Sequence, residues 1–266
     1  MQMGILMTKK LMYGSLFGLL FMVLTVAAEA VELDDVPVLS APEVKDLLER
    51  HSDVLLINNL SRIEFQQQHI PGSINIPAPE VATSPLLRAD DPRIKIFYCM
   101  GLKCAYSRYA IKAALKRGLK NIYWFQGGIP EWRQFDYPME IDPDYAAIEV
   151  KKLSCEQILP LLADQQLQIV DIRPIWLTGV QYFLPGTVHI QMTDLDQKLH
   201  ALRRDRPVLI SDVTMRQSVM AARFLIRQGL TVKGVVKGGM QRGLQMGCPV
   251  ETKPAKSLSG WRTEAP

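Results

Sequence analysis

Two cysteines five positions apart, Cys99 and Cys104, carry the strongest chemical signal in the chain. An apolar strand pattern from Ile96 to Tyr98 runs directly into Cys99, and a short loop and a helix pattern follow. A cysteine at the carboxyl end of a strand, before a loop that opens a helix, lies where backbone N–H groups and the positive end of the helix converge. This environment favours the thiolate, which is the nucleophilic form of cysteine. We therefore predict that Cys99 is a catalytic nucleophile.

The loop after Cys99 is predicted to bind a small anion through its backbone N–H groups, because such groups stabilise negative charge without a metal. The predicted binding residues are Met100, Gly101, Leu102, Lys103 and Cys104. Lys103 or Arg108 could add positive charge, or both could be solvated surface residues. Cys104 could resolve an oxidised or persulfidated Cys99 by forming a disulfide with it, or it could be a bystander at the start of the helix.

The amino terminus has the pattern of a secretory signal. Two lysines precede an apolar run from Leu11 to Ala27, and Ala28-Glu29-Ala30 follows the run. An uncleaved membrane anchor is the alternative, but the run is shorter than the roughly 20 apolar residues that span a bilayer. We expect cleavage after Ala30, a periplasmic or secreted mature protein, and no stable membrane anchor after cleavage.

Charge and histidine spacing exclude two further classes of function. The 266 residues carry a formal net charge of +4, and no basic stripe is interleaved with aromatic side chains. Nucleic-acid binding is therefore not expected. The 4 histidines show no metal-ligand spacing, and His189 and His200, for example, lie eleven positions apart. We expect no metal and no other cofactor.

Landmarks of the first half recur in the second half at a nearly constant offset, which predicts a tandem repeat. Each half begins with a serine, Ser40 or Ser154, three residues before Glu or Gln, which is the capping box that starts a helix. Each half later contains a Gly-Gly pair, Gly127-Gly128 and Gly238-Gly239. Short apolar strands that alternate with amphipathic helices indicate an α/β fold. We predict that each domain has a central, mainly parallel sheet flanked by helices.

The predicted boundaries follow from this repeat. We expect a signal peptide over 1–30, a first domain over 31–142, a second domain over 146–252 and a polar, disordered tail over 253–266. A linker around Pro138 to Ala146 is expected to separate the two domains.

Three motifs of the first half occur in the order seen in rhodanese domains: His69–Pro77, the strand that ends at Cys99, and Gly127–Trp132. The chain resembles a tandem rhodanese over essentially its whole mature length, more strongly in the first half. The resemblance implies that Cys99 is the catalytic residue and that a sulfane sulfur is transferred through a Cys99 persulfide. It also implies a small sulfur-containing anion such as thiosulfate as the donor. The implied acceptor is cyanide or a thiol, including a protein thiol.

The first half departs from the rhodanese pattern in the length of the Cys99 loop and in the residues that end one strand, besides the presence of Cys104 in that loop. The commonest rhodanese loop runs from the cysteine to a helix-starting serine in six steps, whereas Cys99 to Ser107 takes eight. The substrate preference is therefore open. The strand that usually ends in Asp-x-Arg ends here in Asn58-Asn59-Leu60. This removes an expected ion pair, from which we expect a cost in stability only.

The second half has Asp212 at the position of the nucleophile. Because a carboxylate cannot carry a persulfide, we expect this domain to be non-catalytic. The half keeps Asp171-Ile172-Arg173, so we expect its framework to be intact. Whether Asp212 does more than hold loop backbone is open.

The favoured function is a rhodanese-type sulfurtransferase of the thiosulfate sulfurtransferase kind. The alternative is a periplasmic thiol-disulfide or sulfur-binding module that uses Cys99 and Cys104 without thiosulfate turnover. A phosphatase on the same scaffold would need an arginine six residues after the cysteine, and Ala105 occupies that place. We therefore discount the phosphatase.

Four other residues allow two interpretations each. Cys155 and Cys248 could form a disulfide in a secreted protein, but we expect two separately buried thiols. Trp124 and Trp132 flank the first Gly-Gly pair and could line the mouth of a pocket, although core packing is the expected arrangement.

Overall fold

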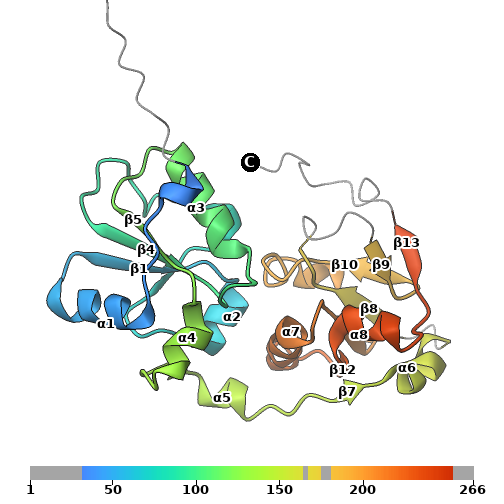
Figure 1. Ribbon diagram of the computed structural model, residues 1–266. Helices are drawn as coiled ribbons and strands as arrows, with labels where there is room; N and C mark the ends of the chain where they lie inside the picture. Colours follow the sequence, from blue (N-terminus) through green and yellow to red (C-terminus); the bar gives the residue numbers. More distant parts are fainter. Residues whose placement is uncertain (1–31, 164–166, 175–180, 254–266) are drawn as a thin grey trace, which may run out of the picture. The chain divides into compact units, whose positions relative to one another are not determined.

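The structure of the protein is a computed structural model in which residues 32–163, 167–174 and 181–253 are described, and by their contacts these residues belong to one compact unit. The predicted signal peptide and nearly all of the predicted tail lie outside the described residues. The described part contains two parallel sheets flanked by helices (Figure 1). This architecture confirms the predicted α/β fold class, and the two sheets fit two tandem domains.

The first sheet has the strand order β3-β1-β4-β5, and every neighbouring pair is parallel. Its strands are β1 (Val54–Asn58), β3 (Ile74–Asn75), β4 (Ile94–Tyr98) and β5 (Ile122–Phe125). The accompanying helices are η1 (Leu33–Asp35), α1 (Ala41–Arg50), α2 (Arg62–Gln67), η2 (Ala78–Glu80), α3 (Tyr106–Lys116) and α4 (Gly128–Gln134). Strand β4 is central, and the whole of its main chain is paired between β1 and β5.

The second sheet has the strand order β10-β8-β11-β12-β7, and its pairs are also parallel. Its strands are β7 (Lys152–Leu153), β8 (Gln168–Asp171), β10 (Thr187–His189), β11 (Val208–Ser211) and β12 (Val232–Val236). The accompanying helices are α6 (Cys155–Leu162), η4 (Leu199–Ala201), α7 (Arg216–Arg227) and α8 (Gly239–Gln245). The order β10-β8-β11-β12 matches β3-β1-β4-β5 strand for strand. A parallel bridge between Val38 and Trp124 lies in the first sheet where β7 lies in the second.

The segment predicted as a linker contains regular structure. It includes β6 (Glu140–Ile141) and α5 (Pro143–Ala146), and β6 pairs antiparallel with β2 (Gln68–His69). The segment between the two halves thus contains short regular elements, and part of its backbone pairs with the first half. A second antiparallel pair joins β9 (Gln181–Phe183) to β13 (Glu251–Lys253), which ends one residue beyond the predicted boundary at 252.

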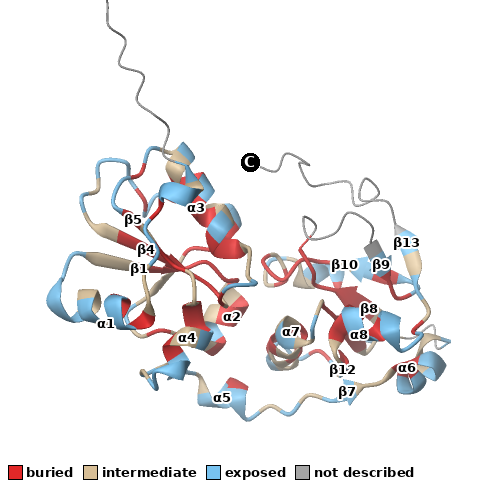
Figure 2. Ribbon diagram, viewed as in Figure 1, coloured by how far each residue is buried: buried red, intermediate tan, exposed pale blue. Residues whose placement is uncertain are grey.

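Local sequence signals explain where the helices begin and end. Ser40 and Ser154 both form the predicted capping boxes, at the starts of α1 and α6. Helix α3 buries Ala110, Ile111 and Ala114 against the sheet and ends before Gly118, whose φ of +71° suits glycine. Buried residues gather on the central strands and on the helix faces that cover them (Figure 2).

Helices α2 and α7 bring the two halves into contact. Ile63 of α2 is buried in the same hydrophobic cluster as Met220 of α7. The side chain of Gln67 donates a hydrogen bond of 2.7 Å to the carbonyl oxygen of Met220. None of the helices in the described ranges is long and apolar enough to cross a membrane.

Candidate active site

Cys99 is the first residue after the central strand β4. Its side chain is 1% exposed, and the residues before it, Phe97 and Tyr98, are fully buried. Seven residues later α3 begins at Tyr106, so the strand, loop and helix that were predicted around this cysteine are all present. The strand fixes the Cys99 backbone within the sheet, and the loop surrounds its sulfur.

Ser107, in the first turn of α3, holds the sulfur of Cys99. The Oγ of Ser107 lies 3.2 Å from the Sγ of Cys99, and the same Oγ accepts a hydrogen bond of 2.9 Å from the indole N–H of Trp124. Because the indole can only donate, it uses a lone pair of the Ser107 oxygen, and the hydroxyl proton is available for donation to the sulfur when Cys99 is ionised. A hydroxyl that donates to sulfur favours the thiolate over the thiol. Trp124 is 8% exposed, which confirms core packing, with the added role of orienting Ser107.

Two opposing influences set the pKa of Cys99. Burial raises the pKa of this thiol. Hydrogen bonds from the Cys104 side chain, the Ser107 hydroxyl and the backbone N–H groups of Ser107 and Gly101 lower it, and together they hold the pKa of Cys99 below its usual value. The neighbouring Cys104 responds in the opposite way, because its hydrogen bond to Cys99, its burial and the nearby sulfur charge all raise its pKa. Of the two thiols, Cys99 is therefore the one that ionises more readily.

The Gly127-Gly128 pair packs directly on the Cys99 loop. The backbone N–H of Ile129 donates a hydrogen bond of 3.1 Å to the carbonyl oxygen of Cys99. Gly128 has a φ of +55°, and a Cβ at this position would lie 2.1 Å from that same oxygen. Gly101, with a φ of +95°, would place a Cβ 2.9 Å from the carbonyl oxygen of Gly127. Only glycine allows the two backbones to approach this closely.

The predicted loop residues have different environments. Gly101 is buried, Met100 and Cys104 are half-buried, and Leu102 and Lys103 are exposed. The N–H of Cys104 donates to the carbonyl oxygen of Gly101 at 2.8 Å, so this amide closes the turn. Of the predicted loop residues, Gly101 donates its backbone N–H to the Cys99 sulfur. A second backbone donor is Ser107, which was not among the predicted residues.

The two predicted cations lie in different places. Arg108 is exposed, and its guanidinium lies 5.9 Å from the ring centre of Trp124. Lys103 lines a cavity beside the loop.

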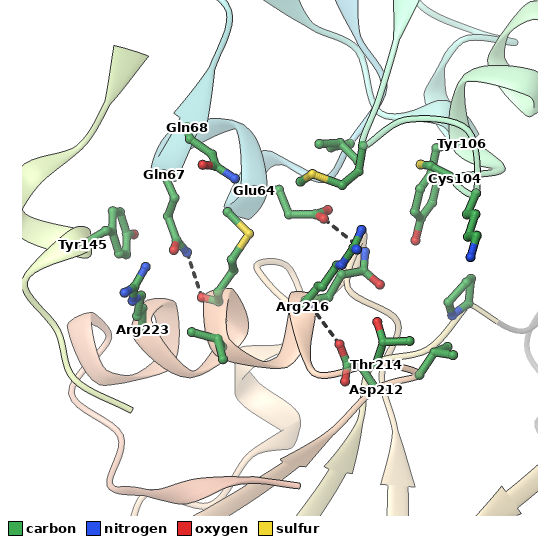
Figure 3. Close-up of a pocket in the computed structure, with 18 of the residues that line it drawn as sticks. Glu64, Gln67, Gln68, Cys104, Tyr106, Tyr145, Asp212, Thr214, Arg216 and Arg223 are labelled. Carbon is green, nitrogen blue, oxygen red and sulfur yellow. Dashed lines mark hydrogen bonds between the residues drawn. The ribbon is translucent and has the colours of Figure 1, made fainter. Parts of the chain in front are cut away.

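This cavity has a volume of about 790 Å³ and receives residues from both halves of the chain (Figure 3). Cys104, Met100 and Lys103 of the Cys99 loop line it, but Cys99 itself does not. Its other charged lining residues are Glu64, Asp212, Arg216 and Arg223. Within the described part of the chain, neither Lys103 nor Arg216 has an ion-pair partner, whereas both carboxylates are buried and hydrogen-bonded. The accessible charge of the cavity is therefore positive.

A buried polar group joins the two halves at the cavity. Glu64 is 1% exposed, and its carboxylate accepts hydrogen bonds from Ser61 of its own helix cap and, at 3.1 Å, from the amide of Gln217. Burial, together with the nearby charge of Asp212, raises the pKa of Glu64 above its usual value. Sequence reasoning missed this group because its members are distant along the chain and belong to no motif.

Asp212 lies after β11, at the place that Cys99 takes after β4. It is 2% exposed. Its Oδ1 accepts from the N–H of Met215 at 2.5 Å, and its Oδ2 accepts from the N–H groups of Gln217 and Ser218 at 2.8 and 3.1 Å. Burial raises the pKa of this carboxyl, and the hydrogen bonds offset part of the effect. The loop of the second half thus binds an anion that belongs to the chain itself.

The second half contains the ion pair that was expected in its framework, between Asp171 and Arg173. Arg173 donates from its backbone N–H and its Nε to the fully buried carboxylate of Asp171, each at 2.9 Å. In the first half, Asn58 accepts from the N–H of Leu60 at 2.9 Å. The asparagine thus keeps the turn but not the ion pair.

Cys155 and Cys248 form a disulfide, with their Cα atoms 5.2 Å apart. The expectation of two separately buried thiols was wrong. The two residues are 93 positions apart, and α6 and the segment after α8 bring them together. Cys99 and Cys104 are free. In the described part of the chain, no group of His, Cys, Asp and Glu has the arrangement of a metal site.

Comparison with known proteins matches residues 40–135 to the rhodanese-like domain. An HTH-type transcriptional regulator of Mycobacterium tuberculosis is 32% identical over 97 residues, which cover 36% of this chain and 42% of that protein. The chain therefore spans about two fifths of that relative. "Putative sulfurtransferase YtwF" of Bacillus subtilis is 28% identical over 108 residues, which cover 40% of this chain and 98% of that protein.

Among solved structures, a thiosulfate sulfurtransferase from Pseudomonas aeruginosa is 21% identical and covers 77% of this chain and 43% of that chain, with a TM-score of 0.37. A rhodanese-like domain protein from Staphylococcus aureus is 22% identical and covers 38% of this chain and 98% of that chain, with a TM-score of 0.33. The part of the chain that matches the rhodanese-like domain, residues 40–135, contains Cys99 and its loop.

Proposed function

We propose that this protein is a sulfurtransferase that moves a sulfane sulfur from thiosulfate or a related donor to cyanide or a thiol through a persulfide on Cys99. The carrying observation is the environment of the Cys99 sulfur. It lies at the end of the central strand and receives hydrogen bonds from the Ser107 hydroxyl and from backbone N–H groups, which lower its pKa. Such donors stabilise both the attacking thiolate and the persulfide that follows.

The positive character of the neighbouring cavity supports an anionic donor. Lys103 and Arg216 line it without an ion-pair partner in the described ranges, and Arg223 bonds there only to the backbone carbonyl oxygens of Ile148 and Ala146. This positive charge attracts a small dianion such as thiosulfate to the cavity beside the Cys99 loop. No step of this chemistry needs a cofactor.

In this proposal the first domain, over 31–142, is catalytic, and the second, over 146–252, is not. The second half has its loop donors committed to Asp212, which supports a non-catalytic role. Its contribution to the site is the opposite wall of the cavity, with Arg216 and Gln217.

The test is the intact mass of the reduced protein before and after thiosulfate, beside the variants Cys99→Ser and Cys104→Ser. We expect one added sulfur atom in the wild type and in Cys104→Ser, and none in Cys99→Ser. No added sulfur in the wild type would contradict the proposal.

A second candidate function rests on the contact between the two free cysteines. The Cys104 side chain bonds to the Cys99 sulfur, so the pair could exchange a disulfide with a partner protein instead of turning over thiosulfate. The same mass experiment separates the two functions. A loss of two hydrogens that requires both cysteines, with no gain of sulfur, would favour the thiol-disulfide module.

We also propose that the mature protein is periplasmic or secreted and begins after Ala30. The disulfide between Cys155 and Cys248 supports an oxidising compartment. Both statements are tested by fractionating producing cells and sequencing the amino terminus of the protein from the fraction in which it is found. A chain that starts at its first residues and stays in the cytosol would contradict them.

A further inference from the structure

The sulfur of Cys99 and the cavity are separated by Cys104. Cys99 is 1% exposed and does not line the cavity, whereas Cys104 is half-buried and does. In its thiol form Cys99 donates to the carbonyl oxygen of Cys104, 3.6 Å from its sulfur. Of the two cysteines, Cys104 is therefore the one that a molecule bound in the cavity can contact (Figure 3).

The two cysteines also lie on the same short loop. The Sγ of Cys99 is 3.6 Å from the carbonyl oxygen of Cys104, and the Cys104 thiol is near enough to affect the pKa of Cys99. The Cys99 sulfur is buried, and its other neighbours are Ser107 and the backbone of Gly101. Among the described residues, Cys104 is therefore the one free thiol that could receive a sulfane sulfur from Cys99.

We propose that Cys104 is a second catalytic thiol, which receives the sulfane sulfur from Cys99 and presents it to a thiol acceptor bound in the cavity. This inference rests on the proposed persulfide chemistry of Cys99. It goes further in assigning a transfer step and in dividing the acceptors into two classes. Cyanide is small enough to reach Cys99 directly, whereas a peptide-sized thiol takes the sulfur from Cys104.

The transfer needs no external oxidant or reductant. The proton of Cys104 passes to the terminal sulfur of the Cys99 persulfide, and the Cys104 thiolate attacks that sulfur. The bond between the terminal sulfur and the Cys99 Sγ breaks, and Cys99 leaves with the electron pair as a thiolate. The products are a Cys104 persulfide and the Cys99 thiolate, which the loop already stabilises. Attack on the inner sulfur would instead give a Cys99–Cys104 disulfide and release hydrosulfide.

Trypsin separates the two cysteines, because it cleaves after Lys103. Cys99 then lies on the peptide 96–103 and Cys104 on the peptide 104–108. The experiment exposes the full-length protein to a pulse of thiosulfate, quenches it at increasing times with a thiol-alkylating reagent and measures added sulfur on each peptide by mass spectrometry. We expect the sulfur to appear first on the Cys99 peptide and then on the Cys104 peptide.

Steady-state turnover with cyanide and with glutathione provides the functional readout. In Cys104→Ser we expect the ratio of the glutathione rate to the cyanide rate to fall about tenfold or more, a ratio in which any effect of the substitution on Cys99 itself cancels. Cys104→Ala should give the same pattern, and thermal unfolding of both variants verifies that they fold. Cys99→Ser should lose turnover with both acceptors.

The outcomes separate this inference from the proposed function. Sulfur on the Cys99 peptide alone, with glutathione turnover unaffected by Cys104→Ser, overturns the transfer step and leaves the sulfurtransferase intact. A Cys99–Cys104 disulfide with released sulfide also overturns it. Sulfur on neither peptide of the wild type contradicts the sulfurtransferase, and the transfer step with it.

Discussion

The loop after β4 and the loop after β11 receive the same support from their Gly-Gly pairs. The N–H after the first pair donates to the carbonyl oxygen of Cys99 at 3.1 Å, and the N–H of Met240 donates to that of Asp212 at 2.7 Å. A Cβ on Gly128 would lie 2.1 Å from the Cys99 oxygen, and a Cβ on Gly239 would lie 2.4 Å from the Val213 oxygen. In both halves, a glycine pair holds the loop at the carboxyl end of the central strand.

The difference is the source of the negative charge. After β11 the carboxylate of Asp212 takes three backbone N–H groups and the hydroxyl of Ser218. After β4 the corresponding donors, from Gly101 and Ser107, face a thiol, whose negative charge appears only on ionisation. The comparison shows that anion binding is a property of the strand-loop-helix scaffold. The residue at the end of the strand decides whether the loop donors bind a carboxylate of the chain itself, as at Asp212, or are available to a thiolate, as at Cys99.

The shorter loop of the second half also costs conformational strain. Met215, directly before α7, has a left-handed φ of +72°, which is uncommon for a side chain of this size. The Cys99 loop is longer, and its left-handed residue is Gly101. The additional length of the first loop accommodates Cys104, which lines the cavity, whereas Cys99 does not.

The strongest test of the comparison replaces the equivalent glycines. Gly128→Ala should destabilise the protein by about 3 kcal/mol and reduce sulfur uptake by Cys99 about a hundredfold, because the new methyl group displaces the Cys99 carbonyl. Gly239→Ala should cost similar stability but leave sulfur uptake within about twofold, since its methyl group meets the other loop. Denaturant unfolding and a thiosulfate uptake assay measure both.

Gly118→Ala is the matched control. Gly118 also has a positive φ of +71°, but a Cβ there meets nothing within 4 Å. We expect a loss of about 1 kcal/mol and normal uptake. If Gly128→Ala behaves like this control, the glycine pair does not position the Cys99 loop.

Ser107→Ala tests whether the hydroxyl supports the thiolate. Removing a donor to the sulfur should raise the pKa of Cys99, so the acidic limb of the pH profile for sulfur uptake should shift to higher pH. Uptake at neutral pH should fall about tenfold to a hundredfold and recover at alkaline pH, because a single hydrogen bond to a charged group is worth about 1.5–3 kcal/mol. Ser107→Thr, which keeps a hydroxyl, should restore the profile. A uniform loss at every pH would mean a merely structural role.

Asp212→Asn tests the internal anion of the second loop. The new amide nitrogen would face backbone N–H groups that now donate to the carboxylate, so one donor is left without an acceptor. We expect a loss of about 1–3 kcal/mol in the free energy of unfolding. Asp205→Asn, on an exposed carboxylate, is the control and should change stability little. Equal effects of the two substitutions would show that the loop does not depend on its carboxylate.

Glu64→Gln should have the smallest effect, on the pH dependence of stability. Burial raises the folded-state pKa of Glu64 above the ordinary 4.5, so its protonated form is the one that the fold favours. Its contribution is therefore fully present below pH 4.5 and is lost as the pH rises through the folded-state pKa. The variant should lack this decline when unfolding is measured from pH 4.5 to 8. Parallel curves for wild type and variant would contradict the assignment.

Much of the site could be predicted from local sequence. The strand before Cys99, the helix after it, the Gly-Gly pair and both capping boxes are signals that lie within a few residues of the structure they specify. Short-range geometry determines such features, because backbone sterics and neighbouring hydrogen bonds act between adjacent residues. The α/β class, which the structure confirms, and the prediction that Cys99 is the nucleophile follow from the same local patterns.

Only the tertiary structure decided which distant groups meet. The contact of Ser107 with Trp124, the link from Glu64 to Gln217, the cavity that exposes Cys104 but not Cys99, and the pairing of Cys155 with Cys248 each join residues far apart in the chain. The wrong expectation, of two separate thiols at Cys155 and Cys248, was of this kind. Its outcome depends on strand register and helix packing, which no single segment encodes because they arise from the burial of all segments together.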